Sequence, residues 1–171
     1  MATFILTVLG DDRPGLVSAL SAPINAHGAS WERSEMSRLA GKFAGIVVVS
    51  VAGDRSDALA ADLAALSDQG LQIVLERSDE AVDPPSVRLT LDLLGSDRPG
   101  IVAEIAAALA AHDVNIEELS TAVRDAPMAG GTLFEAHAAL SAPPSASTDE
   151  LRVMLEGLAD ELMVDLSLTA E

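Results

Sequence analysis

The chain has 171 residues, of which 27 are acidic and 10 basic, so its formal charge is −17. This acidity argues against direct nucleic-acid binding, because neutralising phosphates requires clustered Lys and Arg. The absence of cysteine excludes disulfides, thiol nucleophiles and thiolate metal sites, and the apolar content of 49% excludes a disordered chain. With no secretory leader pattern and no apolar run of roughly 18 residues, we expect a cytoplasmic protein.

The first half of the chain alternates strand-like and helical patterns. Four segments have strand patterns, at 3–9, 29–39, 42–52 and 71–77. Apolar residues recur at helical spacing in two stripes, which are Leu16, Val17, Leu20 and Ile24, and then Leu59, Leu63 and Leu66. Pro23 falls inside the first stripe, where a helix interior tolerates proline poorly, so we expect a kink or an early end there.

The second half follows the same order. Its strand patterns cover 87–94, 114–124, 132–140 and 163–169. Its helical stripes are Ile101, Val102, Ile105 and Leu109, and then Leu151, Met154, Leu155 and Leu158. Ser147 and Glu150 have the spacing of a capping box at the start of the last helix.

The two halves are copies of one unit. The residues from Gly10 to Val17 recur 85 positions later, from Gly95 to Val102, with six of eight identical. The acidic, proline-containing segment 79–86 between the copies is predicted to be a linker, which leaves domains at 1–78 and 87–171. The order βαββαβ in each copy predicts an α+β fold of two tandem ferredoxin-like domains, each an antiparallel sheet with helices on one face.

The third strand of copy one is apolar on both of its sides. Val47, Val49 and Val51 alternate with Ile46 and Val48. One face of the predicted sheet has no helix of its own, so an apolar residue there would be left uncovered. We expect the other copy or a second chain to pack on this face.

The repeated Gly-x-Asp-Arg-Pro-Gly, at 10–15 and 95–100, lies where the first strand of each copy meets the first helix, and we call it the elbow. Its glycines permit a tight turn, and the helix start supplies free N–H groups that suit a carboxylate. The Asp can accept hydrogen bonds from a ligand ammonium or can cap the helix. The elbow therefore suits both ends of a free amino acid, and a capped turn with nothing bound is the alternative.

Both copies resemble ACT domains, small ferredoxin-like modules that bind amino acids and regulate metabolism. The resemblance rests on the two elbows and on Val114-Asn115-Ile116, and it covers nearly the whole chain. The tandem arrangement is similar to the glycine cleavage system transcriptional repressor group. That resemblance implies a protein that senses glycine and acts through a partner transcription activator without touching DNA.

The resemblance also implies that a ligand lies between the elbow and the start of the second strand of a neighbouring domain. In copy one the implied ligand-binding residues are Asp11, Asp12, Arg13, Gly15, Leu16, Ser30 and Trp31. In copy two they are Ser96, Asp97, Arg98, Gly100, Ile101, Asn115 and Ile116. Asn115 is the better polar contact, because its amide can both donate and accept hydrogen bonds. Copy one departs from the family with Ser30-Trp31, whose indole contacts the ligand, fills the pocket or packs at a domain interface.

These observations favour a non-enzymatic, amino-acid-binding regulatory protein with a protein partner. We expect no catalytic residues, no metal, no cofactor, no nucleic-acid or membrane binding, and a chain able to form a homodimer. A structural protein-interaction module without a ligand is the alternative. An enzyme of unrecognised type is the remaining possibility, although no nucleophile elbow, catalytic triad order or phosphate-binding loop is present in the sequence.

Overall fold

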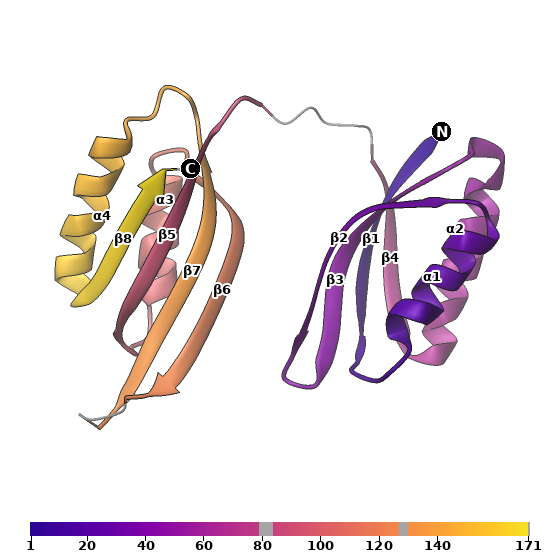
Figure 1. The fold of residues 1–171 in the computed structure, drawn as a ribbon, viewed down its shortest axis with the longest axis horizontal. Helices are drawn as coiled ribbons and strands as arrows, with labels where there is room; N and C mark the ends of the chain where they lie inside the picture. Colours follow the sequence, from indigo (N-terminus) through magenta and orange to yellow (C-terminus); the bar gives the residue numbers. More distant parts are fainter. Residues whose placement is uncertain (79–83, 127–129, 171) are drawn as a thin grey trace. The chain divides into compact units, whose positions relative to one another are not determined.

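The computed structural model describes residues 1–78, 84–126 and 130–170 (Figure 1). The chain divides into two compact units, Met1–Val82 and Asp83–Glu171. Of the segment predicted as a linker, residues 79–83 lie outside the described residues, and residues 84–86 have no regular secondary structure.

The first unit contains four strands, two α-helices and two short 3-10 helices. Its strands are β1 (Ala2–Asp11), β2 (Ser30–Leu39), β3 (Lys42–Val51) and β4 (Leu71–Ser78). Its helices are α1 (Leu16–Ala26), η1 (Gly53–Arg55), α2 (Ser56–Ala64) and η2 (Ala65–Gln69).

Over its described residues, the second unit repeats this order without the 3-10 helices. Its strands are β5 (Val87–Ser96), β6 (Asn115–Asp125), β7 (Thr132–Ala142) and β8 (Val164–Ala170). Its helices are α3 (Ile101–Ala110) and α4 (Thr148–Leu162). The predicted capping of α4 is confirmed, because the Glu150 N–H donates to the Ser147 hydroxyl at 3.3 Å.

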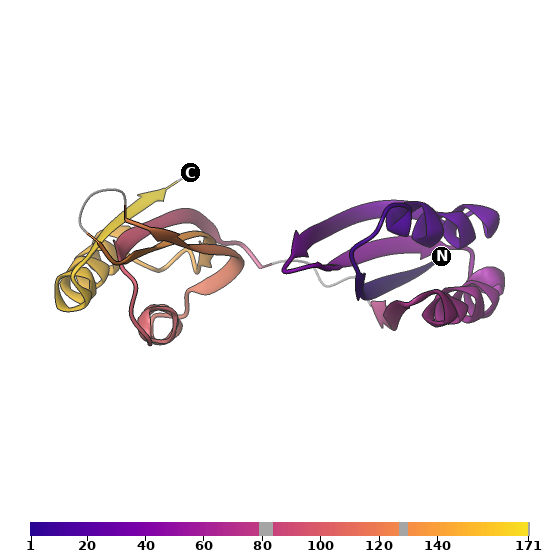
Figure 2. The same cartoon turned by 90° about the horizontal axis from the view of Figure 1, so that it is seen from below.

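Each unit is a layer of four antiparallel strands covered on one face by two helices (Figures 1 and 2). The strand order is β2-β3-β1-β4 in the first sheet and β6-β7-β5-β8 in the second. The predicted tandem ferredoxin-like fold is therefore confirmed. The face of each sheet that turns away from its own helices is called the outer face below.

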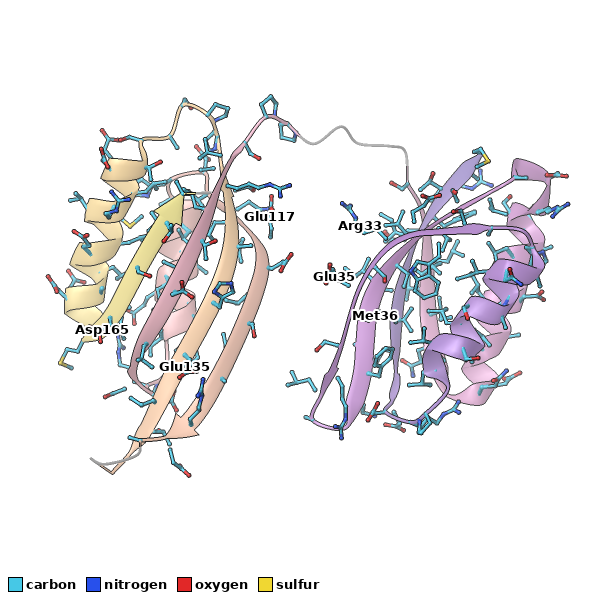
Figure 3. The ribbon with its side chains drawn as sticks, viewed as in Figure 1. Arg33, Glu35, Met36, Glu117, Glu135 and Asp165 are labelled. Carbon is cyan, nitrogen blue, oxygen red and sulfur yellow. The ribbon has the colours of Figure 1, made fainter. Side chains whose placement is uncertain are left out.

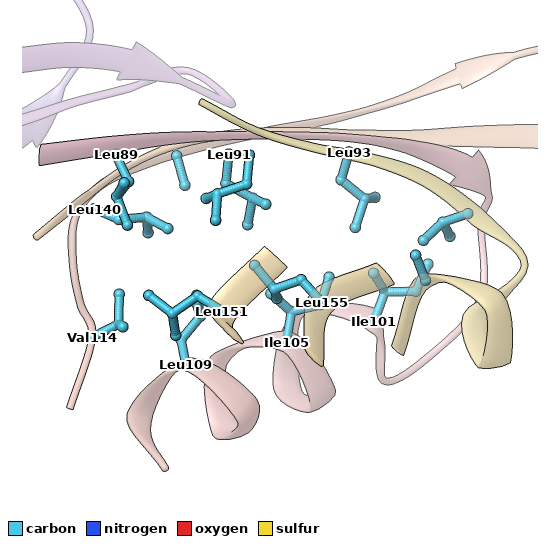
Figure 4. Close-up of a cluster of buried hydrophobic side chains, with 14 of the residues drawn as sticks. Leu89, Leu91, Leu93, Ile101, Ile105, Leu109, Val114, Leu140, Leu151 and Leu155 are labelled. Atoms are coloured by element: carbon cyan, nitrogen blue, oxygen red, sulfur yellow. The ribbon is translucent and has the colours of Figure 1, made fainter. Parts of the chain in front are cut away.

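The core of each unit lies between the sheet and the helices. In the second unit Leu89, Leu91 and Leu93 point from β5 toward Leu109 of α3 and Leu155 of α4 (Figure 4). All five are nearly fully buried, and burying a side chain of this size contributes about 1.5–3 kcal/mol. The apolar residues that alternate along the strands and those that recur at helical spacing thus pack against one another in one apolar layer.

Helix α1 continues through Pro23 to Ala26, so the expected early end is wrong. Pro23 lacks the N–H that would bond to the preceding turn. However, the His27 N–H still donates to the Pro23 carbonyl at 3.1 Å, and Ile24 is 97% buried in the core. The packing of Ile24 therefore holds the last turn of the helix in place.

Within the described ranges, no helix has the length and apolar character that crossing a membrane would require.

Candidate functional site

The two elbows have the same backbone conformation. Gly15 and Gly100 precede the helices with φ of 92° and 99°, in the left-handed region that glycine adopts at little cost. The Asp12 N–H donates to the Gly41 carbonyl at 2.9 Å, and the Asp97 N–H donates to the Thr132 carbonyl at the same distance. Each elbow is thereby fastened to the neighbouring β-hairpin.

Neither elbow helix has a side-chain cap. No side chain accepts a hydrogen bond from the first turn of α1 or α3 among the residues that the structure describes. The alternative in which the elbow Asp caps its helix is therefore wrong. A helix start carries free N–H groups and a partial positive charge, so this first turn can receive a carboxylate.

The charged side chains of the copy-one elbow are already engaged. The Arg38 guanidinium contacts the Asp12 carboxylate at 2.6 Å, and Lys42 pairs with Asp11. The hydrogen bond from Lys42, reinforced by its charge, lowers the pKa of Asp11 below its ordinary value. Arg13 donates to the Gln69 carbonyl at 2.7 Å. Both carboxylates of this elbow thus have a cation beside them.

The copy-two elbow differs in charge pairing. Arg98 contacts Glu104 of α3 at 3.3 Å, while the Asp97 carboxylate has no hydrogen bond or ion pair within the described part of the chain. The reason lies in the paired strands. Lys42 stands opposite Asp11, but Leu133 stands opposite Ser96 at the matching register position.

The second cation is also lost in copy two. Arg38 stands opposite Phe43 in the first unit, and Val123 stands opposite Phe134 at the same place in the second. The second elbow therefore presents a carboxylate that is free to receive an ammonium group.

A cleft of about 320 Å³ lies beside the first elbow. It brings together four of the predicted residues, Asp12, Arg13, Gly15 and Leu16, with Val17, Ser18 and Phe43. Asp12 lines this cleft and its carboxylate is paired with Arg38, so the negative charge beside the cleft is already neutralised.

The predicted second-strand residues, Ser30, Trp31, Asn115 and Ile116, lie at the far end of each sheet from the elbows. Ser30 is opposite Ser50, which is opposite Thr3 at the start of β1, whereas the elbow follows the end of β1. The two ends of a strand of this length are about 27 Å apart. One copy therefore does not bring its own elbow and its own second-strand start together.

The two strand starts share a bulge and differ in their side chains. The register shifts between Trp31 and Arg33 in β2 and between Ile116 and Glu118 in β6. Trp31 is partly buried against the core of its own unit, as Ile116 is in the second unit.

Asn115 instead lies in a cleft of about 370 Å³ within the second unit. Arg88, Asp113, Glu117 and Ser141 line this cleft beside it. The strand start of copy two is thus the more polar of the two.

The three histidines each make a polar contact. His27 contacts Asp62 at 2.7 Å, His112 contacts the Ala108 carbonyl at 3.0 Å, and His137 contacts Asp92 at 2.6 Å. No group of three or more metal-ligating side chains is found among the described residues. None of these contacts forms a nucleophile and base pair.

Comparison with known proteins identifies the repeated unit. The ACT domain family profile matches residues 2–76 and 88–169. The glycine cleavage system transcriptional repressor of Escherichia coli is 25% identical over 162 residues, which cover 92% of this chain and 84% of the relative. Phosphoserine phosphatase SerB2 of Mycobacterium tuberculosis is 33% identical over 95% of this chain, but this chain matches only 39% of that enzyme. A crystal structure of an unknown protein from Galdieria sulphuraria superimposes with a TM-score of 0.89 at 32% identity, covering 99% and 98% of the two chains.

Proposed function

The chain belongs to the ACT domain family, which it contains in two tandem copies, and we propose that it is a non-enzymatic regulator that senses a small amino acid. Its kinship with the E. coli glycine cleavage system transcriptional repressor makes glycine the first ligand to test. The proposal extends to a protein partner, such as a transcription activator, that reads the ligand-bound state. The charge of −17 favours a protein partner over direct DNA contact.

The observation that carries this proposal is the free Asp97 carboxylate beside the uncapped start of α3. The carboxylate suits the ammonium group of an amino acid, and the N–H groups of the first helical turn suit its carboxylate. Because Asn115 lies at the far end of the same sheet, a second copy of the domain would have to supply the strand start that closes the site. Ligand binding at such a junction would favour one arrangement of domains over another.

The proposal is tested by melting the full chain with each standard amino acid at millimolar concentration. A ligand that binds only the folded protein at one hundred times its dissociation constant stabilises it by about 2.7 kcal/mol, which is readily measured as a rise in Tm. Calorimetry on the best ligand then gives the number of sites. If no amino acid raises Tm at millimolar concentration, the sensing proposal fails.

A protein-interaction module without a ligand is the second candidate, and copy one favours it. Its elbow carboxylates are paired with Arg38 and Lys42, and Trp31 packs on its own core. A partner that binds equally well with and without amino acids would support this candidate.

A further inference from the structure

The outer face of the first sheet is apolar at its centre. Leu9, Ile46 and Val74 are 44%, 52% and 58% exposed on it. The partly buried Ile5 and Val48 lie in the row next to Ile46 and Val74. Exposed apolar residues that gather on one face mark a surface that another molecule covers.

One row across the sheet carries opposite charges at its two ends. Ile5 stands opposite Val48 on one side and Glu76 on the other, and Val48 stands opposite Arg33. From the edge strand β4 to the edge strand β2, the row therefore consists of Glu76, Ile5, Val48 and Arg33. Figure 3 shows Arg33 directed away from the helices. Within the described ranges, neither Arg33 nor Glu76 has a hydrogen bond or ion pair.

We propose that this outer face is covered by the same face of a second copy of the chain, related by a two-fold axis that runs along the strands between β1 and β3. Such a rotation exchanges the two edges of the sheet while it keeps each residue at its level along the strands. Arg33 of each copy then lies over Glu76 of the other. One row thus supplies two ion pairs around an apolar centre, which is the self-complementary pattern of a two-fold interface.

The neighbouring rows fit the same rotation. Ile5 meets Val48 of the second copy, and Leu9 meets Ala44, so a large side chain lies opposite a small one. At the edges, Gln72 meets Ser37, which is a polar pair. In the row between these two, Thr7 meets Ile46 and Val74 meets Glu35 of the second copy. Glu35 is on the edge strand β2, so water at the rim can reach its carboxylate.

The size of the face sets the strength of the contact. Four strands spaced by about 4.8 Å and six residues of about 3.4 Å rise give a face of roughly 400 Å² in each copy. The two copies together would bury roughly 800 Å² of surface. Stable protein complexes usually bury about 1,200–2,000 Å² in total. We therefore expect a dimer that dissociates in the micromolar range.

The second unit cannot form this contact. Its matching row consists of Thr169, Thr90, Ala139 and Glu118, which carries no cation. At the positions of Ile46, Val74 and Ile5, its outer face has His137, Ser167 and Thr90. The proposed contact is therefore specific to the first unit.

The test is sedimentation of the full chain over a range of concentrations. Arg33→Glu and Glu76→Arg each place like charges opposite one another and should weaken dimerisation about tenfold or more. The double variant with both changes restores the opposite charges and should regain the dimer. Arg152→Glu, an equal charge change on helix α4 of the second unit, is the matched control and should leave dimerisation unchanged.

Circular dichroism melting curves confirm that each variant is folded before sedimentation. A chain that stays monomeric at high micromolar concentration overturns the proposal, because some other surface then covers this face. Dimerisation that is as strong in both single variants as in the unchanged chain overturns it as well, because the copies then contact each other through another surface. A dimer that is lost in each single variant and regained in the double variant supports it.

Discussion

The two elbows of this chain share one backbone and differ in what surrounds their carboxylates. In the first, Asp12 is paired with Arg38, and in the second, Asp97 has no partner within the described residues. The turn itself is set by the glycine, which has positive φ in both copies. The charge that surrounds each elbow carboxylate is set by residues on other strands. The comparison teaches that a repeated motif conserves a conformation without conserving the chemistry that the motif presents.

The outer faces of the two sheets differ in the same way. The first sheet exposes Ile46 and Val74, whereas the second exposes Asp92, His137 and Asp165 on the corresponding side. Because outward residues do not contribute to the core, they can change without loss of the fold. One copy can thus be suited to association while the other is suited to ligand binding.

The largest expected effect comes from the cores. Leu20→Ala, at a fully buried position of the first unit, should cost about 3 kcal/mol of its stability, within the usual 2–5 kcal/mol for such a truncation. If the copies fold as separate units, hydrogen exchange should accelerate only in the first. Ile105→Ala is the mirror experiment in the second unit. Faster exchange in both units of either variant would show that the two copies unfold together.

The next effect concerns the elbow carboxylates. Asp97→Ala removes a charged hydrogen-bond acceptor, which is worth about 1.5–3 kcal/mol, so amino-acid affinity should fall about ten- to a hundredfold by calorimetry. Asp12→Ala should have a smaller effect, because Arg38 already neutralises that carboxylate. Arg38→Ala, which frees Asp12, should raise affinity at the first elbow. Equal losses in the two Asp variants would contradict the assignment of copy two as the principal site.

The glycines before the helices test the shared backbone. Gly15→Ala and Gly100→Ala each force a residue with a Cβ into the left-handed region, at a cost of roughly 1–2 kcal/mol in denaturant unfolding. At Gly15 a Cβ meets nothing within 4 Å, but at Gly100 it lies 3.1 Å from Glu104 Oε1. The second variant should therefore also disturb the pair between Glu104 and Arg98. Identical costs and an unchanged Arg98 environment would argue against this difference.

The smallest effect is the titration of Asp11. Its pKa is lowered by Lys42, so the favourable contribution of the pair is present above the pKa of the unfolded chain and is lost as pH falls through the folded pKa. In Lys42→Ala the pKa of Asp11 should rise toward 3.8, as followed by the NMR shift of its carboxyl carbon. Copy two has no counterpart, because Ser96 occupies this position. An unchanged titration would show that Lys42 does not hold this carboxylate in solution.

Much of the fold follows from local sequence pattern. Alternation at Val87, Leu89, Leu91 and Leu93 places one side of β5 in the core, and the spacing of Ile101, Ile105 and Leu109 does the same for α3. The early end expected at Pro23 is wrong because local propensity weighs less than burial of Ile24. The predicted site residues of each copy lie in two places rather than one, because their separation along the sheet depends on strand order and register.

The sequence by itself determined that the chain is a duplicated βαββαβ unit with a glycine elbow before each first helix. Hydrophobic periodicity and turn-forming residues involve positions only a few residues apart, so they can be recognised in the sequence without a structure. Only the tertiary structure decided that Arg38 and Lys42 neutralise one elbow while Leu133 and Val123 leave the other free. It also decided that Arg33 and Glu76 stand at opposite ends of one row. Both results depend on which strands are neighbours and in what register, and this pairing is set by the packing of the whole sheet rather than by any local segment.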